Sequence, residues 1–491
     1  MRLETLAQRK PVGGKRAGLS SLKLNRVEVR QPTLIRQEFS LQDFETLISD
    51  GHKTKRERYR VLDSIGWDFK NFQTQYLTHH FHSYPARFIP QIPKTFIRLF
   101  TKEGDTIIDP FCGCGTTIVE AFLNGRDSIG NDFNPLACLI TRAKTRLISD
   151  KELDLLDKNI SEIKRYVDSD HRRREYLKKL PKRNISNLFN RDMINEICLI
   201  KEGLDELKDK EALYELGLVA LSATIWSVIE AENEIDIFAN FYKKINSMMS
   251  IAGELGKVVE KPPQVIVIPG DARDLQIDSK ISPLIVTSPP YVNALDYYRV
   301  HMYNMLWLGL DYENFRKHEI GGHSHFIANR FRLLTEYLAD MLRAMMEMNR
   351  VLKRGGVCVI AVGNSSLEYE LIESYKFFLA FAKYVNFKPV KAIFRNIDTT
   401  RKYSSRDIGK IDDEYIVVLE KERDLRGISA KDDGFVEEVV TKLVREFEQR
   451  VKEKPGSSLR GKRVSKERLE KNAERIAQAI KFIPQDIRIK E

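Results

Sequence analysis

The 491-residue chain carries 81 Lys and Arg against 70 Asp and Glu, a formal net charge of +11, and 42% of its residues are hydrophobic. This composition supplies a buried core and excludes a wholly disordered chain. Five cysteines without paired CxxC spacing exclude a disulfide scaffold and favour a reducing, cytoplasmic location. No stretch reaches the ~18–20 apolar residues of a membrane-spanning helix, and MRLETLAQRK lacks the apolar core of a signal peptide.

The positive charge is concentrated at the two ends of the chain. Residues 1–60 carry a net charge of +7 and residues 421–491 a net charge of +5, whereas residues 61–420 sum to −1. Residues 1–75 are interpreted as a basic N-terminal segment, with a small folded element in its second half. A basic excess favours phosphate backbones or anionic surfaces, although a charged, solvated surface explains it equally well.

A strand, turn, helix and second strand are predicted after residue 76. The apolar run 106–109 ends in an acid, helical residues 117–123 follow a glycine-containing turn, and 128–132 is the second strand. Residues 135–263 then have a helical pattern, including a long buried helix at 211–230. We interpret 135–263 as a helical insertion and as a candidate for target recognition.

Strands return after the insertion and alternate with helices. The predicted strands are 265–268, 284–286, 357–360 and 415–419, with helices at 336–352 and 369–384. This alternation predicts an α/β fold with a doubly wound, mostly parallel sheet covered on both faces. The catalytic domain is thus expected at 76–134 and 264–421, followed by a charged helical C-terminal extension at 422–491.

The turn Asp109-Pro-Phe-Cys-Gly-Cys-Gly-Thr-Thr117 is the first motif with chemical meaning. Its glycines, Gly113 and Gly115, allow a ligand to approach the backbone closely. Asp132, 23 residues after Asp109, ends the next predicted strand, where an acid can accept hydrogen bonds from ribose hydroxyls. The turn matches neither GxGxxG nor GxxxxGK[ST], so nicotinamide cofactors and nucleoside triphosphates are poorly supported.

The second motif is Thr287-Ser-Pro-Pro-Tyr291, directly after the strand at 284–286. Two prolines fix the backbone and remove two N–H donors, while their carbonyls remain as acceptors. Such a turn suits an exocyclic amino group, and Tyr291 offers a ring for base stacking. The plainer interpretation is a rigid loop with a packed tyrosine.

Together, DPFCGCGTT and TSPPY resemble the S-adenosylmethionine-dependent amino-group methyltransferases, above all DNA methyltransferases that act on cytosine N4 or adenine N6. In that family SPPY favours cytosine N4 and DPPY favours adenine N6. The resemblance implies a seven-stranded sheet whose last strand, here 415–419, is reversed. Two further segments agree with it: HSYPARF at 82–88 resembles the segment that holds the methionine end of the cofactor, and GDA at 270–272 the segment that contacts its adenine.

The resemblance also implies roles for individual residues. Ser288 and the Pro289 carbonyl would accept hydrogen bonds from the target amine, and Tyr291 would stack on a base extruded from the duplex. The expected catalytic residues are Ser288, Pro289, Pro290 and Tyr291. The expected cofactor-binding residues are Tyr84, Arg87, Phe88, Asp109, Phe111, Gly113, Gly115, Thr116, Asp132, Asp271 and Ala272. Candidates for nucleic-acid contact, each also explicable as a solvated face, are Arg172, Arg173, Arg174, Arg401, Lys402 and Arg406.

Other chemistries are less well supported. Carbon-5 methylation of cytosine needs a nucleophilic cysteine, typically after a proline, and none of the five cysteines follows one. No metal site is expected, because Cys112 and Cys114 lie within the cofactor turn and His79, His80 and His82 have no carboxylate or cysteine close in sequence. The function expected is therefore a cytosine-N4 DNA methyltransferase. The alternatives are adenine-N6 methylation, methylation of an RNA base, and a non-catalytic nucleic-acid-binding protein. A cognate restriction endonuclease as partner is left open, as is the oligomeric state.

Overall fold

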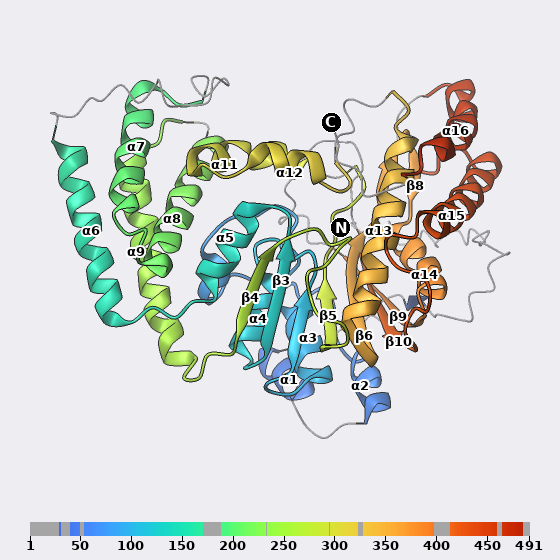
Figure 1. Cartoon of the computed structure of the whole chain (residues 1–491), viewed down its shortest axis with the longest axis horizontal. Coiled ribbons are helices and arrows are strands. Elements are labelled where there is room, and N and C mark those ends of the chain that lie inside the picture. The colour runs from blue at the N-terminus through green and yellow to red at the C-terminus, as the bar shows by residue number, and fades with distance from the viewer. Residues whose placement is uncertain are drawn as a thin grey trace, which may run out of the picture.

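A mostly parallel sheet lies at the centre of the molecule, between two groups of helices (Figure 1). The computed structural model describes residues 29–30, 40–49, 54–169, 188–231, 233–293, 295–322, 328–396, 413–458 and 464–484. From edge to edge, the strands of the sheet are β1 (Val29–Arg30), β9 (Phe387–Asn396), β10 (Asp413–Lys421), β6 (Leu352–Gly363), β5 (Ser282–Thr287), β2 (Thr106–Asp109), β3 (Asp127–Asp132) and β4 (Val265–Pro269).

The strand directions agree with the predicted fold class. β4, β3, β2, β5 and β6 run parallel, whereas β10 runs antiparallel to both β6 and β9. The reversed last strand and the doubly wound, seven-stranded sheet are thus confirmed, and the two-residue β1 adds an eighth strand beside β9. The apolar pattern does not predict β9, because Lys388, Pro389 and Lys391 interrupt it.

The central strands bury both of their faces. Along β6, Val357 and Val359 join the apolar cluster beneath α3, whereas Cys358 and Ile360 join the cluster beneath α13 and α14. This alternation is the period-two pattern of a strand covered on both sides. The helices nearest the sheet are α3 (Gln91–Phe100), α4 (Thr116–Leu123), α5 (Pro135–Lys144), α13 (Phe331–Val351) and α14 (Ser374–Tyr384).

The predicted insertion is helical in its described part. Its core is α8, which is buried nearly all round and packs on α5, α7, α9 and α11 (Met302–Leu308). By length and mean hydropathy alone, α8 is the one described helix that could cross a membrane, but 78% of its apolar window is buried inside the protein. A helix in the core of a soluble protein can also meet these criteria of length and hydropathy. The helices after α5 are α6 (Asp150–Asp168), α7 (Arg191–Asp205), α8 (Glu211–Glu230) and α9 (Ile237–Val258).

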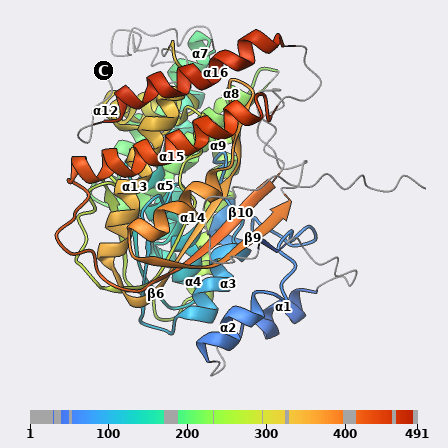
Figure 2. The same cartoon turned by 90° about the vertical axis from the view of Figure 1, so that its right-hand side faces the viewer.

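The C-terminal extension is helical, as expected. It forms α15 (Asp433–Glu453) and α16 (Lys466–Ala479), which lie side by side and pack against α13 (Figure 2). One predicted helix that precedes them in the sequence is shorter than expected. The helix predicted at 369–384 begins only at Ser374, because β8 (Glu370–Ile372) pairs with β7 (Ser365–Leu367) in a separate two-stranded sheet.

The element upstream of residue 76 packs directly against the catalytic sheet. It contains α1 (Leu41–Leu47) and α2 (Lys55–Val61). The Trp67 ring stacks on Phe96 of α3 with ring centroids 5.7 Å apart, and its Nε1–H donates to the Leu62 carbonyl. The same apolar cluster includes β5 and β6 residues. Packing is therefore continuous across the domain boundary predicted at residue 76.

We expect Trp67→Ala to lower the free energy of unfolding by about 3–5 kcal/mol, because the indole is 6% exposed and its loss leaves a cavity. Urea denaturation would measure this against Leu41→Ala, whose side chain is 63% exposed and should change stability by less than about 0.5 kcal/mol. A Trp67→Ala protein as stable as Leu41→Ala would contradict the packing role.

Candidate active site

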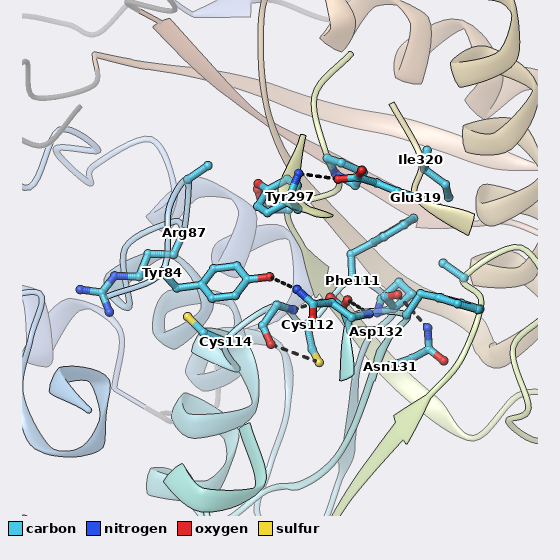
Figure 3. A pocket seen from close by; sticks show the side chains of 18 of the residues that line it. Tyr84, Arg87, Phe111, Cys112, Cys114, Asn131, Asp132, Tyr297, Glu319 and Ile320 are labelled. Atoms are coloured by element: carbon cyan, nitrogen blue, oxygen red, sulfur yellow. Dashed lines mark hydrogen bonds between the residues drawn. The ribbon is translucent and has the colours of Figure 1, made fainter. Parts of the chain in front are cut away.

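A pocket with about 840 Å³ of empty volume lies where β2, β3, β4 and β5 reach their carboxyl ends. Figure 3 shows Phe111, Cys112 and Asp132 on one side of it and Tyr297, Glu319 and Ile320 on the other. Of the residues assigned from sequence, those lining the pocket are Tyr84, Arg87, Phe88, Phe111, Gly113, Thr116, Asp132, Asp271, Ala272, Ser288 and Pro290.

The turn after β2 is tied to the end of β3. The Gly113 N–H donates to Asp132 Oδ2 at 2.8 Å, and the Cys112 N–H donates to the Asn131 carbonyl at 2.9 Å. Gly115, at the start of α4, has φ of 83°, and a Cβ there would lie 2.7 Å from the Thr141 side chain. Glycine is therefore required at this position by both conformation and space. Gly115 itself lies behind the pocket wall.

Asp132 presents a carboxylate that two backbone donors already orient. Its Oδ1 accepts from the Asn134 N–H at 2.9 Å, and its Oδ2 accepts from Gly113. Burial raises the pKa of Asp132 to about 6, although these two hydrogen bonds oppose the rise. Each carboxylate oxygen keeps a further lone pair that can accept a ligand hydroxyl.

Asp109 lies behind the pocket. Its side chain is 0% exposed, and its Oδ1 accepts from the Phe111 N–H at 3.1 Å. Burial raises the pKa of Asp109 to about 7, against the lowering effect of Thr287, Thr117 and the Phe111 N–H. Asp109 therefore shapes the turn but does not line the pocket.

The segment at 82–88 forms one wall of the pocket. The Tyr84 hydroxyl accepts from Asn134 Nδ2 at 3.2 Å, and its ring stacks on His301 with centroids 4.6 Å apart. Arg87 lies on the same wall, but its guanidinium points away from the pocket and donates to the His79 carbonyl at 2.9 Å (Figure 3). The arginine thus braces the segment from behind.

The carboxylate of Asp271 is already engaged. Arg273 donates to it from its backbone N–H, from Nε at 2.9 Å and from Nη2 at 2.6 Å. The same guanidinium donates from Nη1 to Asp340 at 2.7 Å, which ties the turn after β4 to α13. These bonds occupy most of the acceptor capacity of Asp271, so its adenine contact stays a prediction.

The TSPPY turn divides between the pocket and the interior. Ser288 and Pro290 line the pocket, and Pro289 is buried beside them. Tyr291 is half-buried, does not line the pocket, and donates its hydroxyl proton to Glu414 Oε1 at 2.9 Å.

Several lining residues have no place in the sequence motifs. The Phe133 and His318 rings stack with centroids 4.4 Å apart, and both face the pocket. Phe133 and Asn134 could have been suspected because they follow Asp132. Residues 297–320 carry no such signal, although they form α10 (Tyr297–Val300), α11 (Met302–Leu308) and α12 (Tyr312–His318). The lining residues missed from sequence include Asn131, Phe133, Asn134, Tyr297, Phe315, His318, Glu319 and Ile320.

Some expectations cannot be placed. The candidates for nucleic-acid contact, Arg172, Arg173, Arg174, Arg401, Lys402 and Arg406, lie outside the described residues. Within the described ranges, no group of three or more His, Cys, Asp or Glu side chains is arranged to hold a metal ion.

Comparison with known proteins places the chain in a family. The model of the N6/N4 DNA methylase family matches residues 20–142 and 283–479, which together make up more than half of the chain. This chain belongs to the DNA methylase family. Its two matched segments contain both the DPFCGCGTT and the TSPPY turns, and most of the insertion lies between them.

The chain is also similar to individual proteins over parts of its length. The chain is 29% identical over 263 residues to the type II methyltransferase M.MvaI of Kocuria varians, covering 45% of this chain and 55% of that protein. It is 24% identical over 394 residues to M.MjaII of Methanocaldococcus jannaschii, covering 60% of this chain and 73% of the relative. A solved S-adenosylmethionine-dependent methyltransferase from Methanosarcina mazei aligns over 70% of this chain and 99% of its own, with 10% identity and a TM-score of 0.30.

S-adenosylmethionine is the methyl donor of this DNA methylase family, and the pocket fits it. Asn131 lines the pocket, and its Nδ2 donates to the Pro110 and Gly270 carbonyls, which fixes the orientation of the amide. Its Oδ1 is buried and has no hydrogen-bond partner among the described residues. A buried acceptor of this kind suits a ligand N–H donor, and the neighbouring Asp132 carboxylate suits ligand hydroxyls.

We expect Asp109→Asn to change how stability depends on pH. The pKa of Asp109 is raised from 3.8 to about 7 on folding, so its contribution to stability is full below about pH 4 and is lost as pH rises through 7. Relative to the variant, the wild type should lose roughly 3–4 kcal/mol between pH 4 and pH 8. Chemical denaturation across this range measures the difference, with the exposed Asp154→Asn as control. A constant difference between wild type and Asp109→Asn would contradict the raised pKa.

Proposed function

We propose that this chain transfers a methyl group from S-adenosylmethionine to the exocyclic amino group of a base in DNA, with cytosine N4 as the favoured target. One observation carries the proposal. Ser288 and Pro290 of the acceptor-rich turn line the same pocket as Phe111, Gly113 and Asp132 of the cofactor half. A target amine held by the first group would therefore lie beside a methyl donor held by the second, and such positioning supplies much of an enzyme's acceleration.

Different residues at the site have different roles in the proposed reaction. When bound, S-adenosylmethionine would supply an electrophilic methyl group: the amine nitrogen bonds to the methyl carbon as the carbon–sulfur bond breaks, the sulfur leaves as a neutral thioether, and the amine loses one proton to solvent. The Ser288 hydroxyl and the Pro289 carbonyl accept hydrogen bonds from the target amine, which concentrates lone-pair density on its nitrogen. Tyr291 offers its ring to a base extruded from the duplex, because an amine inside the stack cannot reach the pocket. Asp132 accepts hydrogen bonds from the cofactor's ribose hydroxyls.

The choice of substrate follows from the turn and from the relatives. Ser288, in place of an aspartate, favours cytosine N4 over adenine N6 in the family that the turn resembles. M.MvaI and M.MjaII are named type II methyltransferases, which supports DNA as the polymer and leaves room for a companion restriction endonuclease. The relatives are matched over 55% and 73% of their length, so the activity of the whole chain is part of the proposal.

The direct test is to incubate the full chain with methyl-labelled S-adenosylmethionine and unmethylated genomic DNA or total RNA. Digestion and mass spectrometry should then yield N4-methylcytosine from DNA, and Ser288→Ala should lower its yield at least about tenfold by removing an acceptor for the amine. N6-methyladenine would correct the base, and label found in RNA alone would overturn the proposal. Label in neither polymer would favour a non-catalytic binding protein.

The ribose role of Asp132 predicts a pH-dependent affinity for the cofactor. Its pKa of about 6 means that the carboxylate is mostly ionised at pH 7 and mostly protonated at pH 5. Since the ionised form is the better acceptor, the Kd for S-adenosylmethionine should rise about tenfold from pH 7 to pH 5 in the wild type. Titration calorimetry of Asp132→Asn should show weaker binding that changes little over this range. The same pH dependence in both proteins would remove Asp132 from the ribose contact.

A further inference from the structure

The hydroxyl of Tyr291 is the first member of a buried chain of hydrogen bonds. It donates to Glu414 Oε1 at 2.9 Å, and Arg395 Nη1 donates to Glu414 Oε2 at 2.6 Å. Arg395 Nε in turn donates to the Trp67 carbonyl at 3.2 Å. Each carboxylate oxygen of Glu414 thus holds a different partner. This series of hydrogen bonds links the TSPPY turn to β10, to β9 and to the N-terminal element.

The position of Glu414 follows from the reversal of β10. Its register pairs Glu414 with Gly363 at the end of β6 and with Arg395 near the end of β9. Because β10 is antiparallel to β5 and β6, its first residues lie at the end of the sheet where β5 ends and the TSPPY turn begins. A parallel last strand would place its final residues there instead, so the antiparallel direction brings this carboxylate to Tyr291.

The two charged side chains in this series of hydrogen bonds, Glu414 and Arg395, are buried. The Glu414 and Arg395 side chains are each 6% exposed, so separating the pair would leave a charge without a partner in the interior. Burial and the nearby Glu414 charge raise the pKa of Tyr291 well above its ordinary value, so the phenol keeps the proton it donates. Tyr291 as a whole is half-buried, and it packs against the main apolar cluster.

We propose that Glu414 and Arg395 are positioning residues that hold the ring of Tyr291 as the surface on which the target base stacks. This inference rests on the proposed function. Anchoring the hydroxyl fixes where the ring lies, because rotation about the Cα–Cβ bond would carry the hydroxyl away from a buried carboxylate. Rotation about the Cβ–Cγ bond leaves the hydroxyl in place, and packing against the main apolar cluster opposes it. The extruded base would then meet a preformed surface, and the ordering cost would be met on folding and not at each turnover.

The same strand carries a matched control. At the other end of β10, Glu420 Oε2 accepts from the Tyr59 hydroxyl at 3.0 Å, and Lys55 Nζ lies 2.7 Å from Glu420 Oε1. This is again a tyrosine and a cation on one glutamate, but Glu420 pairs with Val357 at the opposite edge of the sheet. Tyr59→Phe and Glu420→Gln therefore remove bonds of the same kind at a more exposed place away from the pocket.

The experiment measures single-turnover transfer of tritiated methyl groups from S-adenosylmethionine to unmethylated genomic DNA, with enzyme in excess. Tyr291→Phe and Glu414→Gln should each slow transfer about tenfold, the effect of losing one hydrogen bond to a charged group. The double variant should be no slower than the slower single variant, because both changes break the same bond. Affinity for S-adenosylmethionine should stay within about twofold, and Tyr59→Phe and Glu420→Gln should transfer at the wild-type rate.

A second measurement does not depend on activity. 3-Fluorotyrosine placed at position 291 should give one ¹⁹F resonance in the free protein, and Glu414→Gln should shift or broaden it while Glu420→Gln leaves it unchanged. An unchanged resonance, or folded Tyr291→Phe and Glu414→Gln proteins that transfer at the wild-type rate, would overturn the positioning role. If wild-type protein labels no DNA, the proposed function fails, and the ¹⁹F result still decides whether Glu414 anchors the ring.

Discussion

The shared direction of β4, β3, β2 and β5 is the constraint on which the rest of the structure depends. Parallel strands end at the same edge of a sheet, so the turns that follow them are gathered into one place. The bond from the Gly113 N–H to Asp132 fixes two of these turns against each other. The turn after β5 then brings Ser288 to the pocket that the other strands have formed.

Buried acids define the chemistry of this edge. Asp109 and Asp132 lie on neighbouring strands, and burial raises the pKa of both. Asp109 is enclosed and braces the turn, whereas Asp132 reaches the pocket with two backbone donors already in place. Two acids at the ends of neighbouring strands thus have separate tasks, which their exposure determines.

The two faces of the sheet are supported by segments distant from the pocket. Residues 40–49 and 54–72 cover one face through Phe44 and Trp67, and α13 to α16 cover the other. The insertion helix α8 reaches the pocket wall, where Ser222 Oγ lies 3.0 Å from His82 Nε2. Family membership is carried by the two motif-bearing parts of the chain, but the pocket geometry also draws on these supporting parts.

The sequence alone determined the α/β class and the two chemical turns, because strand periodicity and glycine or proline chemistry are local properties. The reversed last strand was implied only by the family resemblance of those turns. The sequence also indicated the helical insertion, whose apolar pattern is continuous over 211–230. Only the tertiary structure decided which side chains face the pocket, and it added Tyr297, His318 and Glu319 from a segment without a motif. It likewise paired Tyr291 with Glu414, 123 positions apart. Such contacts depend on strand order and direction across the whole sheet, and no local pattern records them.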